Sequence, residues 1–174
     1  PLARRARWVH TLSAGVDKVL FPELIESPVP LTNGRGVFKD SLAEFAIASI
    51  LFFAKDLRRL VRSQEAGRWE QFDIALVRGQ VLGVIGYGEI GRETARLARA
   101  LGMKVIAARR RMALSSDDHD LERVYPLDQL LDMLGVSAYV LISTRLSPET
   151  SGRVVAAELK AVEPSAVSIN MGKG

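Results

Sequence analysis

The chain has 174 residues, of which 48% are apolar and 25% charged, so it suffices for one globular domain with a core and part of a second. The absence of cysteine excludes a disulfide scaffold, a thiol nucleophile and cysteine-ligated metal sites. The formal net charge of +4 permits an anionic ligand without requiring nucleic acid.

The longest apolar run covers residues 45–54 and is too short to span a bilayer. The amino terminus shows no secretory pattern. We therefore expect no membrane association and favour a cytoplasmic location, although the sequence does not specify the compartment.

The first 35 residues predict two short strands. One covers residues 7–12 and is followed by the small-residue turn Ser13-Ala14-Gly15, and the other covers residues 29–32. Two strands with so few apolar residues do not form a core alone. This region is therefore predicted to be part of a domain whose other half lies outside it.

A long helix is predicted over residues 41–65, ending before Gly67. Ser41 and Glu44 have the spacing of a capping box at its start. Its first half is apolar nearly all round, and its second half is amphipathic and basic. We interpret the basic stretch 55–62 as a solvated helix face, not a nucleic-acid site.

From residue 78 onward, short apolar strands alternate with helices. Strands are expected at 80–85, 104–108, 123–125, 138–143 and 166–170, and helices at 89–101 (with Gly102 as its C-cap), 127–134 and 156–162. This alternation predicts an α/β fold with a doubly wound parallel sheet of the Rossmann type.

A glycine-rich turn joins the first of these strands to its helix. Residues 86–91 read Gly86-Tyr87-Gly88-Glu89-Ile90-Gly91, the G-x-G-x-x-G pattern of a dinucleotide site. We expect Gly86 to make the tight turn, Gly88 to let a pyrophosphate approach, and Gly91 to let the helix pack against the sheet. The alternative is a glycine turn that serves packing alone.

The end of the next strand bears on the choice of cofactor. An acidic residue there binds the ribose of NAD, whereas arginines accommodate the additional phosphate of NADP. Here the sequence is Arg109-Arg110-Arg111, so NADP(H) is favoured and NAD(H) is possible. The acidic stretch 117–120 is interpreted as a solvated loop, and no metal site is expected.

Several segments together resemble the D-isomer-specific 2-hydroxyacid dehydrogenases, a family that includes glyoxylate and hydroxypyruvate reductases. The matching segments are Trp8-Val9-His10-Thr11-Leu12-Ser13-Ala14-Gly15-Val16-Asp17, residues 32–37 leading into 41–44, residues 82–91, residues 146–150 and residues 166–174. Their order and spacing cover nearly the whole chain.

The resemblance implies a nucleotide-binding domain inserted into a flavodoxin-like substrate domain. Residues 1–35 would end the first substrate-domain segment, and residues 36–174 would form the nucleotide-binding domain, truncated after its fifth strand. It also implies a homodimer and a small 2-oxo acid substrate. The implied site residues are Ala14 and Gly15 for the substrate carboxylate, and residues 86–91, Arg109, Arg110, Thr144, Arg145 and Met171 for the cofactor.

One departure from the family concerns catalysis. The family's catalytic arginine falls at Lys173, which keeps the charge but loses the planar fork. The family's acid–base histidine belongs downstream of this motif. The leading hypothesis is an NADPH-preferring 2-hydroxyacid dehydrogenase that is complete only with a further C-terminal part. The alternatives are a non-catalytic dinucleotide-binding module, as in the family's corepressor relatives, and a degenerate fragment without a site.

Overall fold

A computed structural model describes residues 6–16, 19–110, 118–144 and 165–172. The chain divides into two compact units, residues 1–39 and 40–174. Within the described residues, no helix combines the length and the apolar character needed to cross a membrane. The predicted helix at 156–162 lies outside the described ranges.

The first unit contains a parallel pair of strands. The strands are β1 (Val9–Thr11) and β2 (Leu31–Asn33), with Val9 opposite Leu31, and the short helix α1 (Pro22–Ile25) lies between them in sequence. Across the pair, the indole N–H of Trp8 donates to Thr32 Oγ1 at 2.8 Å. Both predicted strands are present, although each is shorter than or displaced from its predicted range.

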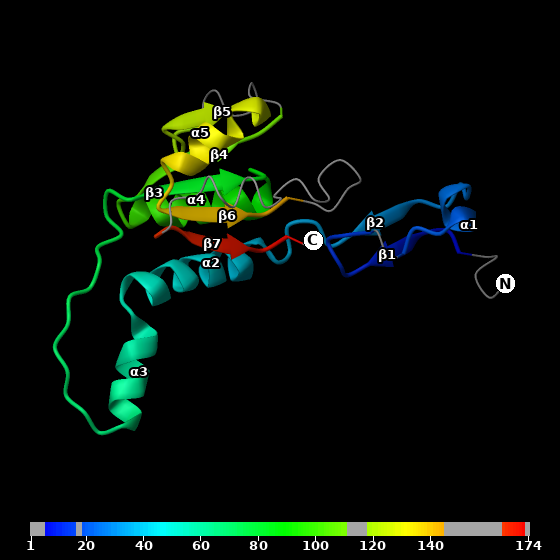
Figure 1. The fold of residues 1–174 in the computed structure, drawn as a ribbon. Coiled ribbons are helices and arrows are strands. Elements are labelled where there is room, and N and C mark those ends of the chain that lie inside the picture. Colours follow the sequence, from blue (N-terminus) through cyan, green and yellow to red (C-terminus); the bar gives the residue numbers. More distant parts are fainter. Residues whose placement is uncertain (1–5, 17–18, 111–117, 145–164, 173–174) are drawn as a thin grey trace. The chain divides into compact units, whose positions relative to one another are not determined.

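The second unit is built on a parallel five-stranded sheet (Figure 1). Its strands are β3 (Val81–Ile85), β4 (Lys104–Ala108), β5 (Arg123–Tyr125), β6 (Tyr139–Ile142) and β7 (Val167–Asn170), in the spatial order β5-β4-β3-β6-β7. The chain therefore places β4 and then β5 on one side of β3, and afterwards returns to place β6 and β7 on the other side. This is the strand order of a doubly wound nucleotide-binding sheet, and the predicted fold class is confirmed.

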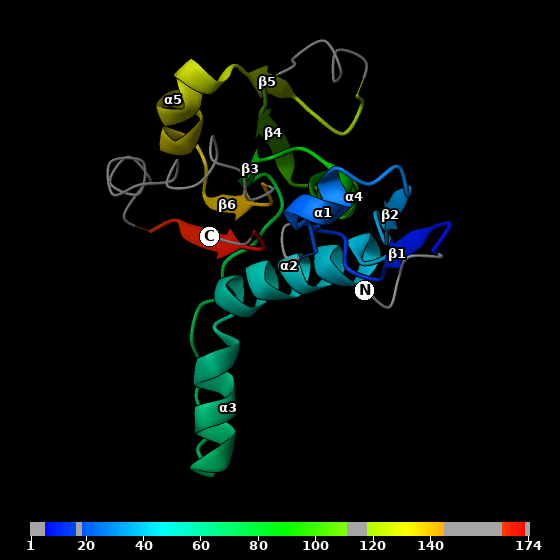
Figure 2. The same ribbon diagram turned by 90° about the vertical axis from the view of Figure 1, so that its right-hand side faces the viewer.

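Helices cover both faces of this sheet (Figure 2). On one face, α2 (Lys39–Ala54) and α4 (Glu89–Ala100) enclose a core with Leu82 and Val84 of β3. On the other face, α5 (Leu130–Gly135), preceded by the 3₁₀ turn η2 (Leu127–Gln129), packs on Ile85. Alternate β3 side chains thus enter opposite cores, as a strand buried on both faces requires.

Helix α4 ends where the sequence predicts. Gly102 has φ +77, its N–H bonds to Arg99 O at 2.8 Å, and the Met103 N–H bonds to Ala98 O at 3.0 Å. This pair of bonds is a Schellman motif. Gly102, predicted as the C-cap, is instead the left-handed residue directly after the C-cap, Leu101.

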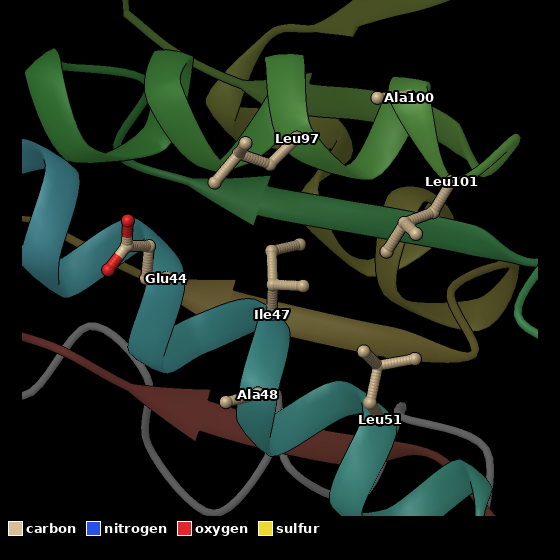
Figure 3. Close-up of a pocket in the computed structure, with 7 residues that line it drawn as sticks. All are labelled: Glu44, Ile47, Ala48, Leu51, Leu97, Ala100 and Leu101. Atoms are coloured by element: carbon tan, nitrogen blue, oxygen red, sulfur yellow. The ribbon is translucent and has the colours of Figure 1, made fainter.

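An apolar groove of about 390 Å³ lies between α2 and α4 (Figure 3). Across it, Ile47 and Leu51 of α2 face Leu97 of α4 and Leu101, the residue that follows α4. Glu44 is the one charged side chain in its lining. The groove lacks the polar groups that a dinucleotide phosphate requires, so it is not a candidate cofactor site.

The single long helix predicted over residues 41–65 is wrong, because the structure has two helices there. Helix α2 begins at Lys39, so Ser41 lies inside its first turn and is not the capping residue of a capping box. The helix ends at Ala54, and α3 (Leu57–Glu65) begins after Asp56. Asp56 adopts the left-handed conformation with φ 43, which interrupts the helix, and its carboxylate accepts the Arg59 N–H at 3.3 Å as the N-cap of α3.

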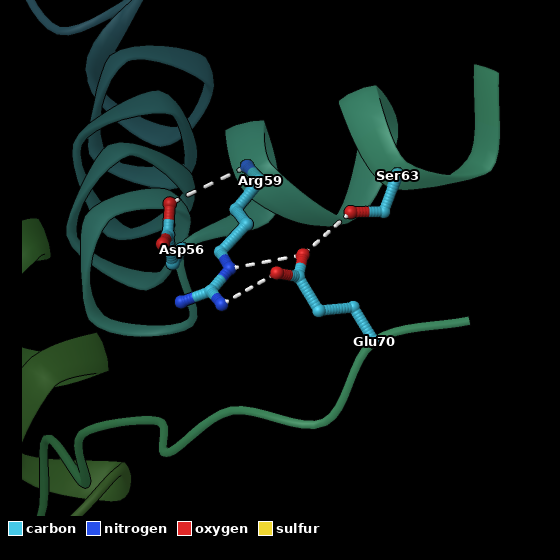
Figure 4. Close-up of polar contacts among 4 residues, drawn as sticks. All are labelled: Asp56, Arg59, Ser63 and Glu70. Carbon is cyan, nitrogen blue, oxygen red and sulfur yellow. Dashed lines mark hydrogen bonds and ion pairs between the residues drawn. The ribbon is translucent and has the colours of Figure 1, made fainter. Parts of the chain in front are cut away.

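We call α3 together with residues 66–76 the arm. Glu70 attaches the returning segment to α3: the Arg59 guanidinium donates to both carboxylate oxygens, at 2.8 and 3.2 Å, and Ser63 Oγ donates at 2.9 Å (Figure 4). The Arg59 guanidinium also lies 4.2 Å from the ring centroid of Phe72. These hydrogen bonds from Arg59 and Ser63 lower the pKa of Glu70 to about 2.

Candidate functional site

The carboxyl ends of the parallel strands bring most of the predicted cofactor residues together. Beyond β3 and β6, Ser143 Oγ donates to Gly86 O at 2.8 Å, and beyond β7 the Met171 N–H donates to Ile142 O at 2.8 Å. The strand order reverses between β3 and β6, which opens a crevice at this edge in sheets of this kind. The candidate residues therefore lie at the edge where sheets of this kind bind ligands.

Gly86 and Gly91 are required by packing. Gly86 has φ +87, and a Cβ there would lie 2.7 Å from the Thr144 backbone nitrogen. A Cβ on Gly91 would lie 3.0 Å from both Gly86 O and Val84 Cγ1. A side chain at either position would force apart the turn, the helix and the sheet.

Gly88 is different, because packing within the described protein does not require it to be glycine. It is the N-cap residue of α4 with φ −100, and no side chain caps the helix. A Cβ at Gly88 would meet no described atom within 4 Å. The turn thus leaves open space in front of a helix N-terminus that no side chain caps, where the backbone amides and the positive end of the dipole favour an anion. This arrangement fits a dinucleotide pyrophosphate.

The side chains within the turn point in different directions. Glu89 is exposed and Ile90 is half-buried. Tyr87 is only 2% exposed and packs in the core between the sheet and α2–α4. It was predicted to line the cofactor site, but its buried side chain leaves only its backbone for such contact.

The arginines follow β4 as predicted. The Arg109 N–H donates to Tyr125 O at 3.1 Å, which fixes the backbone at the end of that strand, and Arg110 is exposed. Thr144 and Met171 are half-buried at the ends of β6 and β7. Arg111, Arg145 and Lys173 lie outside the described residues.

Two further groups at this edge were not predicted. Ser143 bridges β6 to the glycine turn, and Asn170 Oδ1 accepts the Gly172 N–H at 2.9 Å beyond β7. Both come at the carboxyl end of a strand that the sequence does predict. No sequence motif marks these two residues, and the signal that could have identified them is their position at the carboxyl end of a strand.

The turn predicted to bind a carboxylate lies in the first unit. Its carbonyls are engaged: Gly34 N–H donates to Ser13 O at 3.2 Å, Asn33 Nδ2 donates to Ala14 O at 2.6 Å, and Ser13 Oγ donates to Gly15 O at 2.7 Å. No other described residue accepts from the amides of Ala14 and Gly15. Carbonyls that already accept hydrogen bonds, beside amides to which the described residues offer no acceptor, suit an anionic ligand.

Within the ranges that the structure describes, no group of three or more His, Asp or Glu side chains is placed to hold a metal ion. Asp118, His119 and Asp120 are the described part of the acidic stretch.

The comparisons with known proteins agree with one another on a single family. The model of the D-isomer specific 2-hydroxyacid dehydrogenase NAD binding domain matches residues 47–174. A glyoxylate reductase from Thermococcus gammatolerans is 28% identical over 99% of this chain and 53% of its own length. A hydroxypyruvate reductase from Blautia hydrogenotrophica is 30% identical over 97% of this chain and 53% of its own length.

Among solved structures, a D-isomer specific 2-hydroxyacid dehydrogenase from Xanthobacter autotrophicus, in complex with NADPH and MES, is similar with a TM-score of 0.81. It is 26% identical, and the match covers 97% of this chain and 52% of the other. The chain spans about half the length of the curated relatives that it matches.

Proposed function

Because this chain belongs to the D-isomer specific 2-hydroxyacid dehydrogenase family, we propose that the whole protein interconverts a small 2-oxo acid and its 2-hydroxy acid with NADP(H). Glyoxylate and hydroxypyruvate are the proposed substrates. A glyoxylate reductase and a hydroxypyruvate reductase are both similar to this chain over nearly its full length. The observation that carries the proposal is the open Gly88 turn before α4, at the strand-order reversal of the sheet.

The residues present fit the cofactor. The amides at the start of α4 would hold the pyrophosphate, and Arg109 and Arg110 would hold the additional phosphate of NADP(H). The bound cofactor would supply the hydride. A similar structure carries NADPH, which supports NADP(H) over NAD(H).

Residues 1–35 are proposed to belong to the substrate domain and residues 36–174 to the nucleotide-binding domain. The amides of Ala14 and Gly15 would bind the substrate carboxylate. Thr144, Arg145 and Met171 are proposed cofactor contacts, and Lys173 is proposed at the position of the family's catalytic arginine. The non-catalytic module has no support from the comparisons.

We also propose that the whole protein is a homodimer. Large apolar side chains are exposed on α2 and the arm: Phe45 is 62% exposed, Phe53 57% and Trp69 96%. Exposed apolar area of this kind is typical of surfaces that bury against a partner. Light scattering on the whole protein tests this, and we expect Phe53→Glu to yield monomers.

The experiment for the activity uses the natural full-length protein. We expect consumption of NADPH with glyoxylate or hydroxypyruvate, and tighter binding of NADPH than of NADH by nicotinamide fluorescence. In Arg109→Asp, repulsion should weaken NADPH binding and spare NADH binding. A folded protein that binds neither cofactor at millimolar concentration would contradict the proposal.

A further inference from the structure

Ser143 binds two successive carbonyls where the chain leaves β3. Its backbone N–H donates to Ile85 O at 2.9 Å, and its Oγ donates to Gly86 O at 2.8 Å. The first bond continues the pairing of β3 with β6, whose last paired residues are Ile85 and Ile142. The second bond lies beyond this pairing and is made by a side chain. Ser143 thus joins the end of β6 both to β3 and to the first residue of the glycine turn.

The carbonyl oxygen of Gly86 is held from several sides. Besides the Ser143 hydroxyl, it accepts the Gly88 N–H at 2.8 Å. A Cβ on Gly91 would lie 3.0 Å from this oxygen and 3.3 Å from Ser143 Oγ. The carbonyl and the hydroxyl are therefore packed together against the first turn of α4, and the hydrogen bond from Ser143 directs the oxygen towards β6.

The direction of this carbonyl matters for an anion in front of α4. A carbonyl oxygen carries partial negative charge, so one that turned towards the open space beside Gly88 would repel a phosphate. Glycine at positions 86 and 88 gives this segment more backbone freedom than other residues would. Hydrogen bonds must therefore select one conformation of the turn, and the bond from Ser143 is made by a residue 57 positions further along the chain.

We propose that Ser143 is a positioning residue for the cofactor. Its hydroxyl holds the Gly86 carbonyl towards β6 and thereby keeps the glycine turn in the conformation that accepts the pyrophosphate. Ser143 acts through the turn, and its role requires no contact with the cofactor. An alanine at this position would still donate its backbone N–H to Ile85 O, so the pairing of β3 with β6 does not require the hydroxyl.

This inference rests on the proposed function, because dinucleotide binding at the turn is itself a proposal. A protein whose binding-competent conformation is only partly populated has its apparent affinity reduced by that fraction. Loss of the Ser143 hydroxyl should therefore weaken cofactor binding. Because NADPH and NADH share the pyrophosphate, both should lose the same factor. This distinguishes Ser143 from Arg109, whose replacement is expected to affect NADPH alone.

The test compares Ser143→Ala with Ser137→Ala in the natural full-length protein. Ser137 is a matched control, because its hydroxyl also donates to a backbone carbonyl, Met133 O at 2.7 Å, but it lies before β6, at the end away from the turn. We expect Ser143→Ala to weaken NADPH and NADH binding alike, roughly fivefold by nicotinamide fluorescence. Ser137→Ala should leave both affinities within about twofold of the parent. Unchanged affinities in Ser143→Ala, a loss for NADPH alone, or the same losses in Ser137→Ala would overturn the proposal.

A second measurement needs neither cofactor nor activity. The Gly88 N–H donates to the carbonyl that Ser143 holds, so its hydrogen exchange reports the order of the turn. Without cofactor, this amide should exchange faster in Ser143→Ala than in Ser137→Ala, and equal rates would overturn the proposal. If the parent protein binds neither cofactor, the proposed function fails, and the exchange rates then decide by themselves whether the hydroxyl orders the turn.

Discussion

The glycine turn and the arm are stabilised in different ways. In the turn, backbone atoms approach so closely that a Cβ on Gly86 would lie 2.7 Å from a backbone nitrogen. In the arm, exposed side chains hold two segments together, with Arg59 and Glu70 each about 40% exposed. The close backbone packing defines the turn rigidly, whereas solvent competes for the Arg59–Glu70 ion pair of the arm. Substitutions should therefore have larger effects in the turn.

The largest expected effect is from Gly86→Ala. Left-handed strain and the collision with Thr144 should lower the free energy of unfolding by about 3 kcal/mol, measured by denaturant unfolding. Gly79 is the matched control, since it has φ +79 but nothing within 4 Å of a Cβ. Gly79→Ala should cost about 1 kcal/mol from strain alone. Equal losses in the two variants would mean that the close approach at Gly86 contributes nothing.

Gly88→Ala separates binding from folding within the same turn. Because the added methyl meets no described atom, we expect the free energy of unfolding to stay within about 0.5 kcal/mol of the parent. The methyl occupies the space in front of α4, so NADPH affinity should fall roughly tenfold or more, as measured by nicotinamide fluorescence. Unchanged affinity would place the pyrophosphate elsewhere.

At the base of the arm, Asp56→Ala should have a smaller effect on stability. It removes the N-cap of α3 and leaves a Cβ residue at φ 43, so we expect a loss of about 1 kcal/mol in unfolding free energy. Asp56→Gly also removes the cap but relieves the left-handed strain, and should lie nearer the parent. If glycine is as destabilising as alanine at this position, strain at Asp56 is not significant.

The smallest effect is the pH dependence of the arm. The folded pKa of Glu70 is lowered to about 2 from its ordinary 4.5, so its ion pair stabilises the arm above pH 4.5 and is lost as the pH falls towards 2. The indole N–H resonance of Trp69, next to Glu70, should shift over this window. The Trp69 resonance should not shift over this pH range in Glu70→Gln. The Trp8 resonance is an internal control, because Trp8 lies outside the arm. A shift that persists in Glu70→Gln would assign the transition to another group.

The sequence predicts the sheet and the turn because their determinants are local. The parallel sheet follows from short apolar strands joined by helices, and the Gly86 conformation is required wherever this motif leaves a buried strand. The break at Asp56 has no such signal, because Lys55-Asp56-Leu57 is compatible with helix. The break occurs where the chain contacts residues distant in sequence. For example, Lys55 Nζ donates a hydrogen bond to Ala75 O, twenty residues further along the chain, at 2.6 Å. The burial of Tyr87 likewise depends on α2 and the sheet, which a local motif does not specify.

The arrangement of strands around β3 also bears on the order of folding. β3 and β4 are joined by α4 alone, and the Schellman turn at Gly102 directs the chain back to pair Val81 with Lys104. β3 also pairs with β6, but Leu82 and Tyr139 are much farther apart along the chain, so closing that pair costs more loop entropy. The segment from β3 to β4, which contains the glycine turn, can therefore assemble first and serve as the template on which β6 and β7 are added.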